Sequence, residues 1–255
     1  MACKEPTLRK SFTIQKQDAL CAYPYGSFQY LATGLSNGFV TLLPTNPNNK
    51  VRRFVGHRAA VTCIASCSTA PNLVTGSKDG TVRLWAGNEE GDSVTIEPDC
   101  GDVMSVSLSS KYDRLLISGS DGVPSVWDPR YCKSIITLEK HSAGVNCCDL
   151  SSDGLVAVTG SPDGYFRLFD IRSGSVTHTF DCRDTVTAIS LRQTGSAVAA
   201  GTANGTVLLW DSRTQTVLNG SVLHENVVTS LDFHPLKPLL LTASADGHIG
   251  VCDGD

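Results

Sequence analysis

Short apolar runs alternate with polar residues and tight turns along most of the chain. Six Asn-Gly or Asp-Gly dipeptides separate such runs, and they begin at Asn37, Asp79, Asp121, Asp163, Asn204 and Asp246. The steps between them are 42, 42, 42, 41 and 42 residues. Because Asn, Asp and Gly tolerate the positive φ angles of two-residue hairpins, each dipeptide predicts a hairpin turn. The regular step indicates one structural unit repeated six times.

The residues that flank each turn repeat with it. A strand of small residues precedes the turn, as in residues 74–76, and an alternating strand lies earlier, as in residues 61–64. A large side chain follows the turn in most units, and a further apolar run, such as residues 51–55 or 176–180, links one unit to the next. Four short strands in each repeat match one four-stranded blade of a β-propeller.

The pattern therefore predicts a single all-β domain over residues 1–255, a propeller of six four-stranded blades. Three strands in each unit and five linking strands leave the last blade without a fourth strand. Residues 9–14 are predicted to form a lone strand before the first unit, and we expect this strand to complete the last blade. Such pairing of the two termini closes the ring and removes an exposed sheet edge.

The repeats resemble those of the WD-repeat family over residues 8–253. Trp85, Trp127-Asp128, Trp210-Asp211, Gly56-His57 and the turn aspartates carry the resemblance. It implies a buried hydrogen-bond relay of His, Ser/Thr, turn Asp and Trp within a blade. The matching positions are His57, Thr75, Asp79 and Trp85 in repeat two, His141, Thr159 and Asp163 in repeat four, and His224, Thr242 and Asp246 in repeat six.

Charge and composition narrow the possible partners. The chain has 21 Lys plus Arg against 25 Asp plus Glu, a net charge of −4, which argues against a nucleic-acid partner. No apolar stretch approaches the ~20 residues of a membrane span, and the first residues contain no secretory signal. Ten cysteines without a C-x-x-C pair are interpreted as reduced structural residues. We therefore expect a cytoplasmic protein. A propeller needs no dimer to close its ring, so a monomer is the default expectation.

Sequence motifs for catalysis are missing. The chain has no G-x-S-x-G, no G-x-x-x-x-G-K-[ST] and no H-E-x-x-H segment. The Ser/Thr, His and Asp of the repeats could be mistaken for a hydrolase triad, but they recur in register with the turns. A structural role explains such repetition better than a catalytic one. We predict a protein that is not an enzyme and that needs no cofactor or metal.

Charged residues in the loops before each first strand and in the turns are candidates for partner contact. Both loop sets should open on one face of the disc, and loops on a rigid scaffold commonly bind partners. The candidate rim residues are Lys16, Arg58, Lys78, Arg183, Asp184 and Glu225. For any one of them, simple solvent exposure is the alternative interpretation.

A basic cluster formed by Lys50, Arg52 and Arg53 falls on the predicted outer strand of a blade. Charge on an edge strand prevents pairing with another chain, which is one interpretation of the cluster. A docking patch for an acidic partner is the other.

Within the WD-repeat family, the chain resembles the proteome-of-centriole proteins. The segments concerned are Glu5-Pro6-Thr7-Leu8 with Phe12, residues 53–63 and residues 223–244. The resemblance implies a scaffold in centriole and basal-body walls that supports microtubule triplets and cilium assembly. Tubulin or other wall proteins are then the expected partners. That group has seven repeats and a C-terminal coiled coil, whereas this chain shows six repeats.

A second group of WD proteins offers an alternative function. Substrate receptors of cullin-type ubiquitin ligases often carry W-D-x-R at a blade end, and similar segments end here at Arg130, Arg172 and Arg213. Asp is also a common turn-starting residue, so a purely structural origin is the competing explanation.

Overall fold

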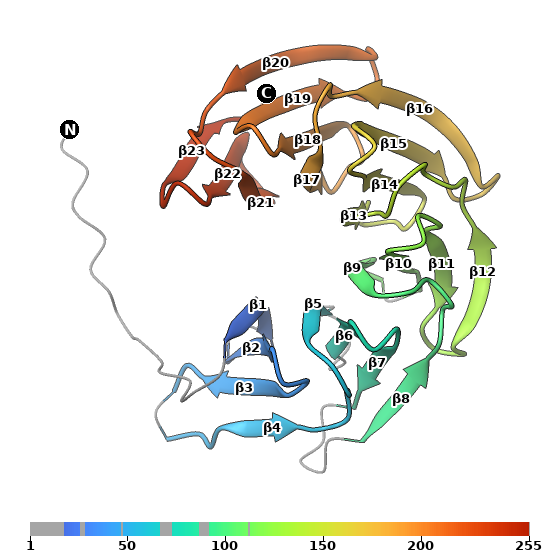
Figure 1. The fold of residues 1–255 in the computed structure, drawn as a ribbon, viewed down its shortest axis with the longest axis vertical. Coiled ribbons are helices and arrows are strands. Elements are labelled where there is room, and N and C mark those ends of the chain that lie inside the picture. The colour runs from blue at the N-terminus through green and yellow to red at the C-terminus, as the bar shows by residue number, and fades with distance from the viewer. Residues whose placement is uncertain are drawn as a thin grey trace.

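The computed structural model describes residues 18–25, 29–46, 48–66, 73–86, 92–111 and 113–254. These residues form 23 β-strands and no helix. The strands make six separate antiparallel sheets, which are the blades of a propeller. Figure 1 shows the blades following one another around a common centre. The prediction of an all-β propeller with six blades is confirmed.

Each blade is a meander in which sequence neighbours pair. Blade 1 contains β1 (Ala19–Tyr25), β2 (Tyr30–Leu35), β3 (Val40–Pro44) and β4 (Arg52–Phe54). Blade 2 contains β5 (Val61–Ser66), β6 (Leu73–Ser77), β7 (Val82–Trp85) and β8 (Ser93–Ile96). Blade 3 contains β9 (Val103–Leu108), β10 (Leu115–Gly119), β11 (Ser125–Asp128) and β12 (Lys133–Thr137).

The second half of the chain repeats this order. Blade 4 contains β13 (Cys147–Leu150), β14 (Val156–Gly160), β15 (Tyr165–Asp170) and β16 (Ser175–Asp181). Blade 5 contains β17 (Val186–Leu191), β18 (Ala197–Thr202), β19 (Thr206–Asp211) and β20 (Thr216–Val222). Blade 6 contains β21 (Val228–Phe233), β22 (Leu239–Ser244) and β23 (Ile249–Asp253).

Blade 6 has three strands within the described residues, so the structure contains 23 strands where the sequence predicts 24. The expected closing strand at residues 9–14 lies outside the described part of the chain. Among the described residues, blade 6 and blade 1 do not pack against each other as successive blades do. Figure 1 shows the resulting opening between them.

The first strand of each of blades 2 to 6 packs against the face of the preceding blade. The strands β1, β5, β9, β13, β17 and β21 contact one another in that order. A fully buried valine stands at or just before the start of the first strand in blades 2 to 6, namely Val61, Val103, Val145, Val186 and Val228. A Cβ on Gly34 would lie only 2.6 Å from Cγ1 of Val61, so glycine is required for this close approach.

Asp149 ties three blades together beside the central channel. Its carboxylate accepts hydrogen bonds from the Ser107 hydroxyl of blade 3 at 2.9 Å and from the Leu191 amide of blade 5 at 2.8 Å. Burial raises the pKa of Asp149 to about 6 despite these donors. The channel is a cavity of about 1100 Å³ that is lined mainly by the first strands.

The eight cysteines of the described segments are free thiols. Four of them are Cys21, Cys63, Cys100 and Cys148, and burial raises the pKa of each to about 12. They pack as small apolar side chains within the blades, the role that the sequence analysis expects of them.

The turn glycines provide a matched test of blade packing. Gly38 has φ +86° and a Cβ added there would lie 2.6 Å from the His57 carbonyl oxygen of the next blade. Gly247 has φ +85°, and a Cβ there would meet nothing within 4 Å. We expect Gly247→Ala to cost about 1–2 kcal/mol from backbone strain alone. Gly38→Ala should cost about 1–3 kcal/mol more because of the added clash. Equal losses in urea unfolding would contradict this account of the interface.

Candidate functional site

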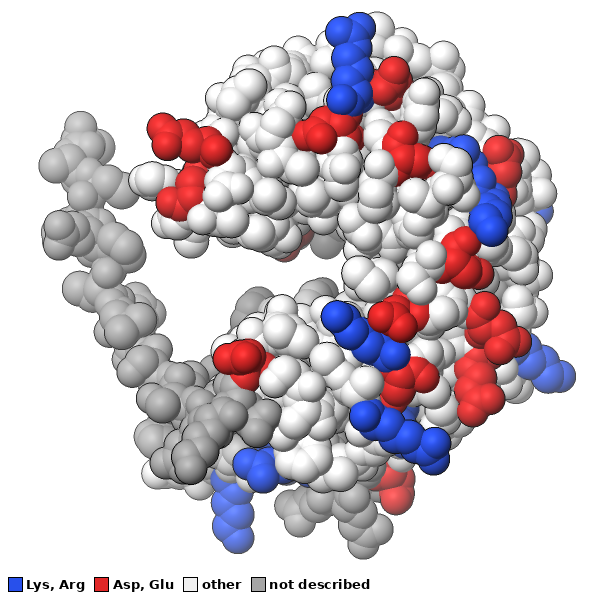
Figure 2. All heavy atoms as spheres, in the orientation of Figure 1, with Lys and Arg blue, Asp and Glu red and all other residues white. Residues whose placement is uncertain are grey.

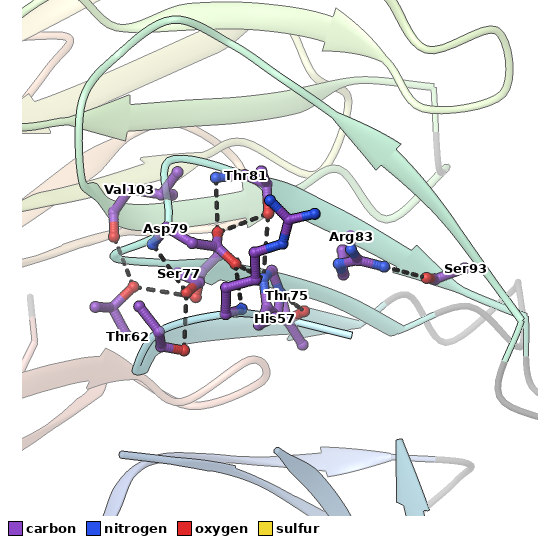
Figure 3. A network of polar contacts seen from close by, with 12 residues as sticks. His57, Thr62, Thr75, Ser77, Asp79, Thr81, Arg83, Ser93 and Val103 are labelled. Carbon is purple, nitrogen blue, oxygen red and sulfur yellow. Dashed lines mark hydrogen bonds and ion pairs between the residues drawn. The ribbon is translucent and has the colours of Figure 1, made fainter. Parts of the chain in front are cut away.

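The four relay residues of blade 2 meet in the structure, and Figure 3 shows three of them, His57, Thr75 and Asp79. His57 precedes β5, Thr75 lies on β6, Asp79 forms the β6–β7 turn and Trp85 ends β7. Nδ1 of His57 lies 3.0 Å from Oδ2 of Asp79, and Nε2 lies 2.8 Å from Oγ1 of Thr75. The Trp85 indole N–H donates to the same hydroxyl oxygen at 2.9 Å.

These contacts define one direction of hydrogen bonding. The Asp79 carboxylate can only accept, so we assign the imidazole proton to Nδ1 of His57. Nε2 is then an acceptor for the Thr75 hydroxyl, whose oxygen in turn accepts from Trp85. Each donor of His57, Thr75 and Trp85 in the relay has an acceptor in this arrangement, which avoids a cost of ~1–3 kcal/mol for each unpaired group.

The surroundings set the protonation of the relay. Burial lowers the pKa of His57, and the Asp79 carboxylate opposes this effect without overcoming it. Burial alone raises the pKa of Asp79, but hydrogen bonds from the Thr81 hydroxyl and from the Arg58 and Thr81 amides lower it to about 2. The relay therefore holds a neutral imidazole beside an ionised carboxylate at neutral pH.

Blades 4 and 6 contain the same geometry without the tryptophan. The Nδ1 to carboxylate distance is 3.0 Å for His141–Asp163 and for His224–Asp246. The Nε2 to threonine hydroxyl distance is 2.8 Å in both, and the partners are Thr159 and Thr242. Phe169 fills the tryptophan position of blade 4 and is fully buried.

The relay is closed to substrates. The hydroxyls that would act as nucleophiles belong to Thr75, Thr159 and Thr242, and all three residues are 0% exposed. A nucleophile must reach the reacting atom, so these His–Thr–Asp sets serve as structural clamps between strands and turns. Within the described residues, no group of three His, Cys, Asp or Glu side chains could hold a metal ion.

Acid should destabilise the fold in two stages. The pKa values of His57 and His141 are lowered in the folded state, so the unfolded chain binds protons first as pH falls below about 6.5. Stability falls again between about pH 4 and 2, because the pKa of Asp79 falls from 3.8 in the unfolded chain to about 2 in the fold.

Thermal melts between pH 8 and 3 measure this dependence. Between pH 7 and pH 5 the lowered pKa values of His57 and His141 reduce stability, whereas the raised pKa of Asp149 contributes in the opposite direction. We expect the slope of melting temperature against pH in this range to become less positive in His57→Gln. An unchanged slope in His57→Gln would contradict the neutral imidazole.

A hollow of about 640 Å³ lies beside the blade 2 relay and contains two of the predicted rim residues. Arg58 precedes β5 and Lys78 lies in the β6–β7 turn, and both are exposed. The loop between blades 2 and 3 contributes Glu97, Asp99 and Asp102 to the same hollow. Neither cation forms an ion pair with any described residue.

The remaining rim candidates do not join this hollow. Arg183 and Glu225 are exposed in the loops before β17 and β21. Asp184 is engaged within its own blade, because its carboxylate accepts from the Asn204 amide at 2.8 Å and from the Thr185 amide at 2.7 Å. Asp184 thus secures the turn of blade 5, which has no relay histidine. Lys16 lies outside the described residues.

The acidic wall of the hollow could not be found from the repeat pattern. Glu97, Asp99 and Asp102 belong to an inter-blade loop, where the positions of charged residues follow no periodicity. Arg83 forms part of the hollow as well and packs over the Trp85 ring at 5.9 Å. Arg83 lies on β7 between the apolar residues Val82 and Leu84. This alternation in the sequence indicates that the Arg83 side chain points away from the buried face.

The basic cluster lies on the outer edge of blade 1. Arg52 and Arg53 belong to β4, and Lys50 precedes it. The guanidinium of Arg52 lies 5.3 Å from the Tyr30 ring centre, and that of Arg53 lies 5.5 Å from Phe39. Both arginines therefore pack on aromatic rings of their own blade, an arrangement suited to a protected edge.

The W-D-x-R segments have a local structural role. The aspartates accept backbone hydrogen bonds from the arginines two residues later, at 2.9 Å for Asp128–Arg130 and 2.7 Å for Asp211–Arg213. The Arg130 side chain also pairs with Asp128 at 2.7 Å. These contacts build the turn after the third strand, so the motif is explained without a ligase partner.

Charges of both signs are mixed over the face in Figure 2. Lys and Arg side chains alternate there with Asp and Glu around the ring, and no large area carries one sign. A partner that binds this face would be recognised by contacts between individual charged groups rather than by a broad electrostatic field of one sign. No helix among the described residues is long and apolar enough to cross a membrane.

Family comparisons agree with the fold. Residues 48–86 and 93–128 match the family model described as WD domain, G-beta repeat. Residues 135–249 match the model described as the N-terminal domain of nucleolar protein 10-like proteins. The six blades, the regular spacing of the turns and these family matches agree with one another. The chain is a WD40-repeat β-propeller.

Several curated proteins are similar in sequence. A guanine nucleotide-binding protein subunit beta of Oryza sativa subsp. indica is 30% identical over 224 residues, which cover 78% of this chain and 58% of the relative. Striatin of Rattus norvegicus is 26% identical over 92% of this chain and 34% of its own length. The chain thus spans a little more than half of the length of the first relative and about a third of the length of the second.

A solved structure has the same architecture. One chain in the crystal structure of a mitotic checkpoint complex superimposes with a TM-score of 0.86 and 20% sequence identity. The match covers 95% of this chain and 79% of that chain. At this identity the likeness establishes the fold alone.

Proposed function

We propose that this chain is a non-enzymatic scaffold that binds other proteins on the rim of its propeller. The observation that carries the proposal is the hollow on blade 2. Arg58 and Lys78 come from successive loops, lie exposed in that hollow and have no ionic partner among the described residues. A rigid blade beneath them fixes their spacing, which favours a partner with matching carboxylates.

The acidic wall adds direction to such binding. Glu97, Asp99 and Asp102 line the same hollow as the two cations. An acidic segment that lies over Arg58 and Lys78 would be repelled from that wall unless it carries a cation there. The hollow therefore selects a segment with carboxylates at one end, in one orientation.

The names of similar proteins support an interaction role. They include a subunit of a guanine nucleotide-binding protein, a 40 kDa protein of the U5 small nuclear ribonucleoprotein and a chain of a checkpoint complex. Each name denotes one part of a larger assembly. By analogy, we expect this propeller to act within an assembly too.

The finer proposal places the scaffold in the wall of centrioles or basal bodies. It rests on the resemblance of residues 5–12, 53–63 and 223–244 to the centriolar WD-repeat proteins. Tubulin is an acidic protein and would present carboxylates to Arg58 and Lys78. In this setting the scaffold supports microtubule triplets during cilium assembly and is found in the cytoplasm with the cytoskeleton.

Charge reversal tests the hollow. The double variant Arg58→Glu with Lys78→Glu should weaken co-sedimentation with microtubules by about tenfold or more, since two attractive contacts become repulsive. The matched control is Arg172→Glu with Lys237→Glu, which makes the same change of charge at two exposed residues on other blades. Equal binding by the two variants would show that the hollow is not the site of partner binding.

Imaging of the tagged protein tests the location separately. Enrichment at basal bodies is the expected result, and diffuse fluorescence would overturn the centriolar part while leaving the scaffold. Co-purification of a ligase adaptor that is lost in Arg130→Ala with Arg213→Ala would instead support the ubiquitin-ligase alternative.

A further inference from the structure

Blade 5 ends in an outer strand that carries no charge. β20 has seven residues and lies on the outer rim of the ring (Figure 1), where β19 is its one partner among the described strands. Residues 214–223 contain no Lys, Arg, Asp or Glu. Val217 and Leu218 are each 45% exposed, Val222 is 71% exposed and Leu223 is 46% exposed. This edge therefore combines exposed apolar side chains with a free row of strand backbone.

The outer strands of blades 1 to 4 are protected by charge or by shortness. β4 contains Arg52 and Arg53, β12 begins with Lys133 and β16 ends with Asp181. β8 has only four residues and is followed directly by Glu97. Charged or short edge strands resist pairing with another chain, and β20 is neither charged nor short. Its register shift against β19 also occurs in β12 and β16, so this shift does not set β20 apart.

One hydrogen bond shows which backbone groups of β20 face outward. The Leu223 amide donates to the Gly205 carbonyl of the same blade at 3.2 Å. In an antiparallel pair, alternate residues direct both backbone groups toward the neighbouring strand. Ser221 therefore faces β19 as Leu223 does, whereas the N–H and C=O groups of Gly220 and Val222 point to the free edge. A strand placed along this edge would meet donors and acceptors that need partners.

The sequence of β20 is nearly symmetric about a central glycine. Residues 217–223 read apolar, apolar, polar, glycine, polar, apolar, apolar, and they are Val217-Leu218-Asn219-Gly220-Ser221-Val222-Leu223. Two antiparallel copies that meet at Gly220 would place Leu218 opposite Val222 and Val217 opposite Leu223. Apolar cross-strand pairs stabilise a sheet, and no like charges oppose each other in this register. A second copy of β20 is thus complementary to β20 itself.

We propose that two copies of this chain pair through their β20 strands, which run antiparallel about a two-fold axis at Gly220. The outward backbone groups of Gly220 and Val222 bond to the second copy, as in other recognition by strand addition. The four strands of each blade 5 then join into one continuous sheet across the dimer. Because a two-fold contact uses the same surface on both copies, the assembly closes at two chains and does not extend into a fibre.

This contact lies on blade 5 and the hollow lies on blade 2, so the proposal goes beyond the function proposed above. The double variant Arg58→Glu with Lys78→Glu should form the dimer as the unmodified chain does. Substitutions in β20 should conversely leave the cations of the hollow in place. Failure of one proposal is therefore distinguishable from failure of the other.

Sedimentation velocity of the full 255-residue chain over a range of concentrations tests the dimer. We expect the mass to rise from that of one chain to that of two as the concentration increases. Leu218→Lys with Val222→Lys should raise the dissociation constant about tenfold or more, because a lysine of one copy then opposes a lysine of the other. The matched control is Thr177→Lys with Thr179→Lys, which adds the same charge at exposed positions of β16 and should leave the dimer unchanged.

Exchange of charge between two variants tests the register. Leu218→Glu with Val222→Glu should be monomeric alone, but an equimolar mixture with the lysine variant should form a mixed dimer, because each lysine then faces a glutamate. The unmodified chain decides the question even if a variant loses its fold. A single chain at every concentration, a dimer that the lysines do not weaken, or a mixture without a mixed dimer would each overturn the proposal.

Discussion

Trp85→Ala is expected to lower the free energy of unfolding by about 3–5 kcal/mol. The side chain is fully buried at the end of β7. Its ring stacks on Phe54 of the neighbouring blade with centroids 5.3 Å apart and planes 13° from parallel. Removing it leaves a cavity at the junction of two blades and takes away the donor that satisfies Thr75. Both losses act in the same direction.

The matched control is Trp127→Ala in blade 3. Trp127 follows its turn at the same distance as Trp85, but it is only half-buried and donates to Ser125 within its own strand at 2.8 Å. We expect it to cost about half as much, since less apolar area leaves water. Chemical unfolding followed by circular dichroism measures both. A Trp85 loss no larger than that at Trp127 would refute the role of the relay at the junction.

Thr75→Val is expected to cost about 2–4 kcal/mol even though it preserves side-chain shape. The Thr75 hydroxyl lies between Nε2 of His57 at 2.8 Å and the Trp85 indole N–H at 2.9 Å. Valine supplies neither an acceptor for the indole nor a donor for the imidazole. Both groups are buried, so water cannot replace the lost partners.

Blade 4 provides the comparison for this change. Thr159 bonds only to His141, because Phe169 has no donor to offer. Thr159→Val should therefore cost less than Thr75→Val by about 1–3 kcal/mol, the penalty for one unpaired buried donor. The two melting curves give this difference directly. If the two variants lose equal stability, the indole bond contributes nothing to the fold.

The blades could be predicted from the sequence because their determinants are local. Asp79-Gly80 sets a hairpin, and the alternation of Val82 and Leu84 with Arg83 sets which face is buried. The relay positions follow from the same register, since a fixed spacing from the turn brings His57, Thr75 and Asp79 together. Repetition strengthens each inference, because an error in one blade would break the pattern in the others.

The hollow and the opening could not be predicted in this way. The acidic wall formed by Glu97, Asp99 and Asp102 depends on an inter-blade loop, whose path is set by packing and not by period. The hydrogen bond from the Asn204 amide to Asp184, a predicted rim residue, occurs in a blade without a relay histidine, and no repeated motif indicated it. The exposure of Ile249 depends on whether another blade follows, which no pattern within its own repeat encodes.

The raised pKa values of the buried cysteines have a practical consequence. Maleimides and iodoacetamides react with the thiolate, and thiols with a pKa of about 12, such as Cys21, Cys63 and Cys182, carry almost none at neutral pH. A new cysteine on an exposed strand would react far faster than these. Fluorophores for distance measurements across the open ring can therefore be attached without first replacing these buried cysteines.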